Sequence, residues 1–353
     1  MPCKASIPSG GFKIALEYAN KFSRDGYIVH MIYPHISIWS MYTIKLKIIK
    51  IIGFYINKYF RNNNCKKWFN LDTKIKECFV WSLSQRFVPK ADIYIATAIE
   101  TSIYLNEYNI DESKKFYFIQ GFENWRFPDD KVIESYHYKI NKIVISNWLM
   151  DIMQNINEEA MFIPNGFDFT YFAKYNSIES RNKNIISCIY NNNVEIKGIN
   201  VLLDALYIVK KQNPNLSIMM FGTSPRPNNL EDWFIYKQSP NKDEHNYILN
   251  SSAIFVGASN IEGWGLPIGE AMQCGCAIAC TDNKGYLEMA KDEQTALVSP
   301  VGDSNSLAYN ILRLINDNDL RHRIAKNGYD FIQQFDINKS YQNLKDFIIK
   351  KNR

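Results

Sequence analysis

The chain has 353 residues, 46% of them hydrophobic and 22% charged, and it carries a formal net charge of +5. This length accommodates two domains of ordinary size, each with its own hydrophobic core. The small positive charge argues against a dedicated nucleic-acid-binding protein and is compatible with small anionic ligands.

The first half of the sequence predicts helices and strands in alternation. Apolar residues at helical spacing predict a helix over 12–24, which Asp25 and Gly26 end. Strands are expected at 27–33, 93–96, 115–119, 143–145 and 160–163. The turn Pro164-Asn165-Gly166 then closes this half.

Residues 39–67 form an aliphatic and aromatic stretch with basic residues and no acidic ones. A basic amphipathic segment of this kind can lie on an anionic membrane surface. The alternative is a core-facing helix with a solvated basic face. The basic residues are Lys45, Lys47, Lys50, Lys58, Arg61, Lys66 and Lys67.

The second half again alternates, with a strand at 185–189, a helix at 198–211 and a strand at 216–221. After residue 301 only helices are expected, the last over 337–349. The whole pattern predicts an α/β protein with parallel sheets. The loop at 166–184 has few apolar positions and is the expected domain boundary.

A chemically informative unit lies at 252–275, where a short apolar strand is followed by a tight loop and a helix start. Glu262 lies on the loop and Glu270 in the first turn of the helix, whose helix-forming residues run from Ile268 to the terminal glycine, Gly275. Backbone N–H groups at a helix N-terminus favour a phosphate, and a carboxylate accepts hydrogen bonds from sugar hydroxyls. The combination fits a nucleotide-sugar better than a metal or a nucleic acid. The alternative is an ordinary turn with two solvated glutamates.

This unit resembles the donor site of the family-4 glycosyltransferases, which are retaining, metal-independent enzymes with a Glu-x7-Glu signature. Their GT-B fold has two Rossmann-like domains that face a central cleft, and a last helix that crosses back onto the first domain. The resemblance implies an acceptor-side domain at 1–170, a donor-binding domain at 171–330 and the crossing helix at 331–353. The matching string is Glu262-Gly263-Trp264-Gly265-Leu266-Pro267-Ile268-Gly269-Glu270.

The resemblance also implies roles for particular residues. Glu270 would hold the ribose hydroxyls, and Glu262 would contact the transferred sugar. The donor would also be bound by the backbone of Gly265, Leu266, Pro267, Ile268 and Gly269. The amides of 266–269 would face the diphosphate. Lys197, followed by Gly198, matches the family's diphosphate-neutralising lysine. The alternative for Lys197 is a solvated side chain before a helix.

Two departures from the family pattern stand out. The family usually has an arginine shortly before the lysine, whereas 190–195 contains no cation, so Arg226 becomes a substitute candidate. The family's first strand also has no good counterpart, because only eight residues, two of them prolines, precede the turn at Ser9, Gly10 and Gly11. We expect a misplaced start or a truncation there, and prefer the former.

On the first domain, Gly10 and Gly11 would let the backbone approach the diphosphate or the acceptor, or would simply form a tight turn. Gln120 and Glu123 resemble a Gln-x-x-Glu segment of bacterial enzymes that build surface polysaccharides, and would orient the acceptor. The five histidines have no spacing typical of a catalytic triad or a metal site.

The resemblance implies transfer of a sugar, with retention, from a nucleotide-sugar co-substrate to a surface glycan or a lipid-linked saccharide, without cofactor or metal. Alternatives are a catalytically silent partner subunit, or a nucleotide-sugar epimerase or phosphorylase of the same fold. Seven scattered cysteines, and the lack of a leader or a long apolar run, predict a cytoplasmic protein that segment 39–67 could hold at the inner membrane face.

Overall fold

The computed structural model describes residues 1–3, 8–36, 46, 53, 65, 68–125, 127–228 and 230–352. The chain divides into two compact units. Unit 1 contains residues 1–164 and 340–353, and unit 2 contains residues 165–339. Most of the basic segment 39–67, including all seven of its basic residues, lies outside the described residues.

Unit 1 contains a parallel four-stranded sheet in the order β3-β4-β5-β6 and a separate parallel pair, β1-β2. The strands are β1 (His30–Ile36), β2 (Lys76–Ser82), β3 (Tyr94–Ala96), β4 (Lys115–Ile119), β5 (Asn141–Val144) and β6 (Ala160–Phe162). The helices are α1 (Gly10–Arg24), α3 (Ile99–Asn106), α4 (Asp129–Tyr136) and α5 (Asn147–Asn155), with short 3₁₀ turns η3 (Gln85–Phe87) and η4 (Glu112–Lys114).

Central strand β4 is buried at all five positions, as expected for a strand covered on both faces. The strand expected at 27–33 is displaced: β1 begins at His30, and Tyr27 and Ile28, which precede it, are 48% and 80% exposed. Among the described residues that precede α1, none is in a strand; residues 4–7 are outside that set.

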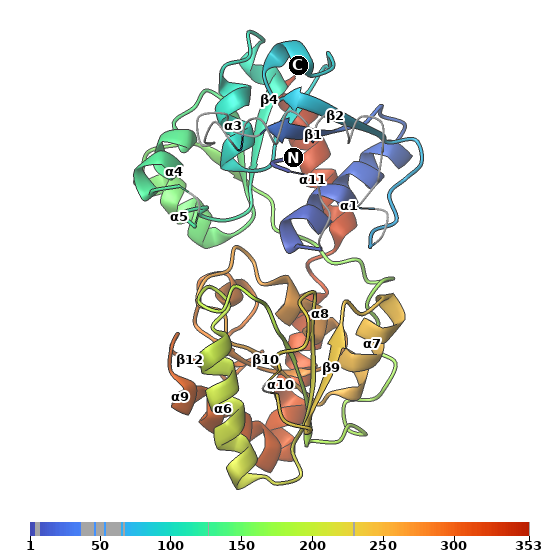
Figure 1. Ribbon diagram of the computed structural model, residues 1–353, viewed down its shortest axis with the longest axis vertical. Helices are drawn as coiled ribbons and strands as arrows, with labels where there is room; N and C mark the ends of the chain where they lie inside the picture. Colours follow the sequence, from blue (N-terminus) through green and yellow to red (C-terminus); the bar gives the residue numbers. More distant parts are fainter. Residues whose placement is uncertain are drawn as a thin grey trace. The chain divides into compact units, whose positions relative to one another are not determined.

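The last helix, α11 (Ile337–Lys351), belongs to unit 1 from Ser340 onward. Figure 1 shows α11 in red among the blue and green elements of unit 1. Phe347 contacts the ring of Phe116 in β4 edge-on, and Tyr341 contacts Phe22 of α1 in the same way. The chain therefore returns to its first domain through this helix, as the GT-B resemblance implies.

Unit 2 contains a parallel six-stranded sheet in the order β12-β11-β10-β7-β8-β9. Its strands are β7 (Ile185–Ile189), β8 (Ser217–Gly222), β9 (Phe234–Gln238), β10 (Ile254–Gly257), β11 (Ala277–Thr281) and β12 (Leu297–Ser299). Its helices are α6 (Ile199–Gln212), α7 (Lys242–Ser251), α8 (Leu266–Gln273), α9 (Ser304–Asn316) and α10 (Asn318–Ile332), with the 3₁₀ turn η5 (Tyr286–Glu288).

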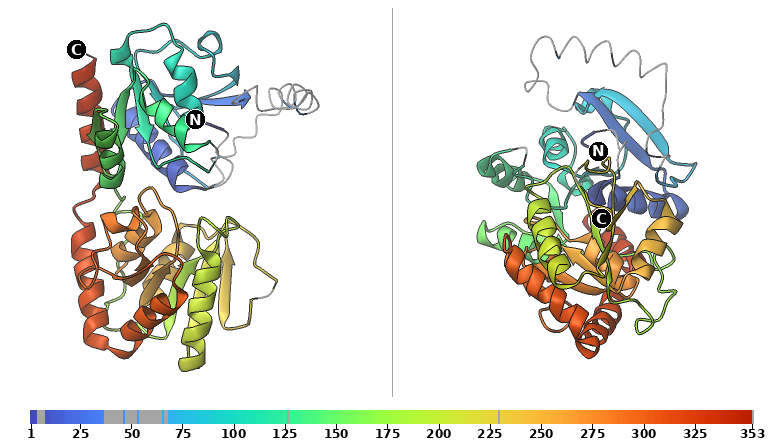
Figure 2. Two further views of the ribbon diagram at one scale, coloured as in Figure 1. Left: turned by 90° about the vertical axis from the view of Figure 1, so that its left-hand side faces the viewer. Right: turned by 60° about the horizontal axis from the view of Figure 1, so that its bottom comes forward.

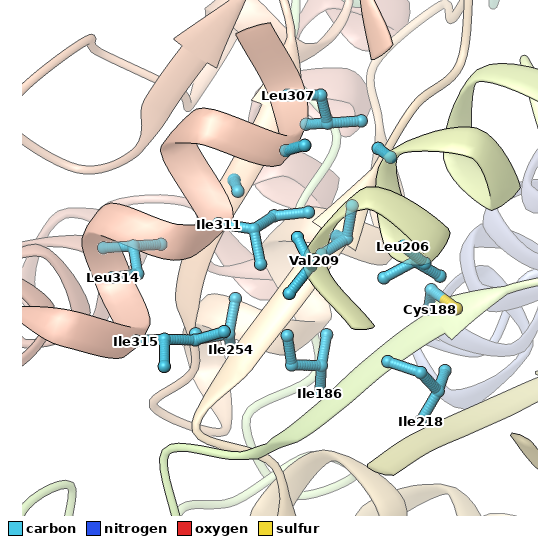
Figure 3. Close-up of a cluster of buried hydrophobic side chains, with 14 of the residues drawn as sticks. Ile186, Cys188, Leu206, Val209, Ile218, Ile254, Leu307, Ile311, Leu314 and Ile315 are labelled. Atoms are coloured by element: carbon cyan, nitrogen blue, oxygen red, sulfur yellow. The ribbon is translucent and has the colours of Figure 1, made fainter. Parts of the chain in front are cut away.

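Helices cover both faces of this sheet (Figure 2). Strand order runs outward from β7 in both directions, so the right-handed crossovers place α6 and α8 on opposite faces. Helix α9 packs on α6, and Figure 3 shows Val209 of α6 and Ile311 of α9 above Ile186 and Ile254 of the strands. This core fixes the carboxyl ends of β7, β10 and β11 side by side, where ligands of open α/β sheets bind.

Candidate functional site

The loop at 258–265 connects β10 to α8 and ends in Gly265, whose φ of 91° is left-handed. A Cβ at this position would lie 2.5 Å from Cδ1 of Tyr286, so both conformation and packing require glycine. Helix α8 begins at Leu266, earlier than Ile268, where the sequence suggested it starts. Pro267 suits the first turn because an N–H there would have no helical partner.

The amides at this helix start are less available than expected. Pro267 has no N–H, and the N–H groups of Ile268 and Gly269 reach the Gly265 carbonyl at 3.2 and 3.5 Å. Of the four expected amides, 266–269, Leu266 alone keeps an N–H without a main-chain partner in the described part of the chain. An anion at this helix terminus would therefore rely on one amide and on nearby side chains.

Lys197 and Glu262 form an ion pair, with Lys197 Nζ 2.6 Å from Glu262 Oε1. Their side chains are 31% and 14% exposed, so both remain accessible to a ligand. The sequence pointed to the two residues separately, to Lys197 for a diphosphate and to Glu262 for a sugar. The structure brings them into direct contact beyond the carboxyl ends of β7 and β10 (β10 is labelled in Figure 1).

Gly198 explains how the two loops approach each other. Its φ is 57°, and a Cβ would lie 1.9 Å from the carbonyl oxygen of Ala258. Asn260 extends the contact, since its N–H donates to the Ile196 carbonyl at 2.9 Å and its Nδ2 to the Glu195 carbonyl at 2.7 Å. The Lys-Gly pair of the sequence is thus one structural unit: the glycine admits the neighbouring loop and the lysine meets its carboxylate.

Glu270 lies in the middle of α8 and is only 6% exposed. A buried carboxylate on the helix that follows the 258–265 loop is compatible with the expected ribose contact. The preceding residue, Gly269, packs against Phe167 of the same unit: a Cβ there would lie 2.1 Å from Cζ of Phe167.

The segment at 281–286, which follows β11, is the part of the site that sequence reasoning missed. Thr281 Oγ1 and Asn283 Nδ2 donate to the Ser259 carbonyl at 2.6 and 2.9 Å. A Cβ on Gly285 would lie 2.4 Å from the Glu262 carbonyl oxygen, so this segment lies directly behind Glu262. The sequence signal for this segment was its position directly after a strand, β11, which the structure places beside β10.

Arg226, the candidate substitute cation, is hydrogen-bonded close to its own loop. Its Nη1 donates to the Phe234 carbonyl at 2.8 Å, and its Nη2 donates to the carbonyls of Leu230 and Glu231 at 3.0 and 3.2 Å. These bonds engage the guanidinium in closing the loop between β8 and β9. Arg226 therefore has a role in loop structure, and its role toward the donor stays a prediction.

The acceptor-side candidates are also engaged within unit 1. Gln120 Nε2 donates to the Gly11 carbonyl at 3.3 Å, where α1 starts at Gly10. Glu123 Oε2 accepts from the Ile99 N–H at 2.6 Å and so caps the N-terminus of α3. Both side chains have an architectural role, and the structure supplies no separate observation for a role toward an acceptor.

Within the described ranges, no group of three or more His, Cys, Asp and Glu side chains is arranged to hold a metal ion. All seven cysteines are free thiols. In the same ranges, no helix is both long enough and apolar enough to span a membrane.

Comparison with known proteins finds a family model that resembles unit 2. Residues 173–331, most of unit 2, match the model of the glycosyl transferases group 1. The capsular polysaccharide biosynthesis glycosyltransferase CapM of Staphylococcus aureus is 25% identical over 202 residues, which cover 53% of this chain and 53% of CapM. O-antigen chain mannosyltransferase B of Escherichia coli is 30% identical over 105 residues, 30% of this chain and 27% of that protein. The matched regions thus span about half or less of these relatives.

Solved structures show the same fold over nearly the whole chain. Anabaena HepE, crystallised with UDP and glucose, has a TM-score of 0.72 at 14% identity and covers 98% of both chains. Sucrose-phosphate synthase of Thermosynechococcus elongatus has a TM-score of 0.67 at 14% identity, covering 97% of this chain and 93% of that one. The chain therefore has the GT-B fold, and most of its second unit matches the model of the group 1 glycosyl transferases.

Proposed function

We propose that this protein transfers a sugar from a nucleoside-diphosphate sugar to a hydroxyl group of a surface glycan or a lipid-linked saccharide. The observation that carries the proposal is the accessible Lys197–Glu262 pair, 2.6 Å apart beside the start of α8. Support for the acceptor class comes from relatives named for capsular polysaccharide and O-antigen chains. Support for the donor class comes from HepE, which was crystallised with UDP-glucose.

Each residue has a distinct part in the proposed donor complex. Lys197 Nζ and the Leu266 N–H bind the diphosphate, a Glu262 carboxylate oxygen accepts from a hydroxyl of the transferred sugar, and Glu270 accepts from the ribose. Binding requires Lys197 to exchange part of its contact with Glu262 for a phosphate oxygen. The pair therefore holds both side chains at the site before the donor arrives.

The proposed reaction proceeds with retention at the anomeric carbon. The bond from that carbon to the diphosphate oxygen breaks, and the acceptor oxygen attacks from the same face. The acceptor proton passes to the leaving phosphate, so no protein nucleophile is needed. The ammonium of Lys197 stabilises the negative charge that grows on the diphosphate, and such a preorganised charge contributes on the order of 3–4 kcal/mol.

We extend the proposal to metal independence, because protein cations would neutralise the diphosphate. Lys197 is the first. Lys284 is a second candidate, since it is exposed, immediately precedes Gly285 behind Glu262, and forms no ion pair in the described part of the chain. Turnover should then be unchanged in excess EDTA, and Lys284→Gln should weaken diphosphate binding several-fold.

The test measures release of nucleoside diphosphate from UDP-glucose, UDP-N-acetylglucosamine and GDP-mannose by the full chain. Wild-type protein should turn over at least one donor, and Glu262→Gln should abolish most of that activity. Glu195→Gln is the matched control, because Glu195 lies on the same side of the unit but is exposed. A wild-type protein that binds a donor without turning it over would favour the silent partner subunit.

A peripheral association with an anionic membrane through residues 39–67 is a further part of this proposal. Its support is the run of seven basic residues without an acidic one. Co-sedimentation with phosphatidylglycerol vesicles should fall when Lys45, Lys47 and Lys50 are changed to Glu. Unchanged co-sedimentation would contradict the proposed membrane association.

A further inference from the structure

Two hydroxyl groups lie behind Glu262, in a place the proposed reaction does not yet use. Ser259 Oγ lies 2.8 Å from Glu262 Oε1, and Tyr286 Oη lies 3.2 Å from Ser259 Oγ. Both residues are buried, with 5% of Ser259 and 3% of Tyr286 exposed. The three side chains come from two loops, 258–265 and 281–286, which follow neighbouring strands β10 and β11.

The direction of each hydrogen bond in this chain is fixed by chemistry. An ionised carboxylate only accepts, so Ser259 must donate its proton to Glu262. The Ser259 oxygen is then left to accept, and Tyr286 donates to it. Burial, together with the charge of Glu262, raises the pKa of Tyr286 well above its ordinary value, so its hydroxyl stays protonated.

Tyr286 is itself held in place on several sides. Its N–H donates to Asn283 Oδ1 at 3.0 Å. Its ring fills the space that side chains at Gly257 and Gly265 would need, since a Cβ at either position would lie within 3.0 Å of it. The tyrosine therefore contacts the end of β10 and the start of α8 at once.

The two carboxylate oxygens of Glu262 differ in consequence. Oε1 receives both Lys197 Nζ and Ser259 Oγ. In the described part of the chain, no protein donor contacts Oε2. A carboxylate anchored through one oxygen presents the other in a defined direction.

We infer that Ser259 and Tyr286 are positioning residues, which anchor Glu262 Oε1 so that Oε2 accepts from a hydroxyl of the transferred sugar. This inference rests on the proposed function. It assigns the hydroxyl chain Tyr286–Ser259–Glu262 to sugar binding rather than to nucleotide binding. Because the ring of Tyr286 also supports Gly265, its ring and hydroxyl have separable roles, and phenylalanine removes the hydroxyl alone.

The first test uses Ser259→Ala, Tyr286→Phe and the double variant, with UDP, UDP-glucose, GDP and GDP-mannose as calorimetric probes. Each single substitution should weaken binding of the nucleotide-sugar about tenfold, the scale of one hydrogen bond to a charged group. Binding of the matching diphosphate should not change. The double variant should bind the nucleotide-sugar no more weakly than the weaker-binding single variant does, because either change breaks the same chain of hydrogen bonds.

Tyr236→Phe is the matched control, since Tyr236 Oη donates to a main-chain carbonyl, that of Ser224, at 2.5 Å, within the loop after β8. It should leave all four probes unaffected. Multiplicative losses in the double variant would overturn the inference. Equal losses of affinity for the nucleotide-sugar and for its matching diphosphate would overturn the inference as well.

A second test needs no ligand and separates this inference from the proposed function. Urea unfolding should show coupling between Tyr286→Phe and Glu262→Gln, and this coupling should vanish when Ser259 is changed to Ala. Coupling that is absent, or that persists without the Ser259 hydroxyl, would overturn the inference. A wild-type protein that binds none of the four probes would overturn the proposed function, whereas the unfolding cycle would still decide the positioning role.

Discussion

In unit 1, Gly11 in the first turn of α1 lies against Gln120. In unit 2, Gly265, which precedes α8, lies against Tyr286. Both regions lie where a helix begins near the carboxyl ends of parallel strands. In unit 1, Gln120 bonds a main-chain carbonyl and Glu123 bonds a main-chain N–H. In unit 2, the lysine and the glutamate bond each other and stay accessible.

The partners of the polar side chains distinguish a ligand-binding region from a similar-looking region with an architectural role. A polar side chain that completes a helix end has its hydrogen-bonding capacity used by the fold. Side chains that satisfy each other in an accessible ion pair can exchange partners when a ligand arrives. On this criterion, we expect the proposed donor chemistry in unit 2.

The largest effect should come from the ion pair. Lys197→Ala should lower the rate of nucleoside diphosphate release about 10²- to 10³-fold, because it removes a charge aimed at the leaving group. Gln120→Ala in unit 1 should lower it less than about threefold, since Gln120 bonds only the backbone. Steady-state rates of both variants, each checked for folding by circular dichroism, measure the contrast. Comparable losses in the two variants would erase the distinction between the units.

The next effect concerns stability at the start of α8. Gly265→Ala should lower the free energy of unfolding by about 1–2 kcal/mol for the left-handed backbone and by about 1–3 kcal/mol more for the contact with Tyr286. Gly302→Ala is the matched control, because Gly302 also has a left-handed φ, 84°, but open space around it. Urea denaturation of the two variants isolates the packing contribution. Equal losses would show that the Tyr286 contact is unimportant.

A smaller effect should follow from Glu123→Ala in unit 1. Loss of the contact with the Ile99 N–H should cost about 1 kcal/mol of stability, as for other helix caps. Turnover at saturating donor and acceptor should remain at the wild-type level. Denaturation and initial rates measured on the same preparation test this. A large loss of turnover with stability unchanged would instead place Glu123 among the acceptor-binding residues.

The smallest effect is a pH dependence in the attachment of α11 to α1. Hydrogen bonds from Lys345 and then Tyr341, both at 2.7 Å, lower the pKa of Asp25 below its ordinary 3.8. A depressed carboxyl pKa stabilises the fold above the unfolded-state pKa, and this contribution is lost as the pH falls through the folded-state pKa. Asp25→Asn should therefore make stability less dependent on pH below about 4. An unchanged pH profile would contradict this coupling.

Local patterns sufficed for much of the fold and for part of the site. The strand, loop and helix around Glu262 could be predicted because each is encoded by consecutive residues. Lys197-Gly198 was also recognisable from its position after a strand. By contrast, the start of α8 was misplaced, because the left-handed conformation of Gly265 depends on its packing against Tyr286.

The remaining features depend on strand order, which periodicity does not reveal. Tyr286 reaches Ser259 only because β11 neighbours β10, and Lys197 reaches Glu262 only because β7 lies on the other side of β10. The bonds of Arg226 could not be foreseen, because its three partners are main-chain carbonyls of the β8–β9 loop and of the first residue of β9, which leave no signature in residue types. Glu123 likewise bonds a main-chain group, the N–H of Ile99 at the N-terminus of α3.

The most direct measurement is a crystal structure of the protein with a nucleotide-sugar that it turns over. We expect a diphosphate oxygen within hydrogen-bonding distance of Lys197 Nζ and the Leu266 N–H. A hydroxyl of the transferred sugar should donate a hydrogen bond to Glu262 Oε2. A nucleotide bound elsewhere, with the Lys197–Glu262 pair intact and facing solvent, would contradict it.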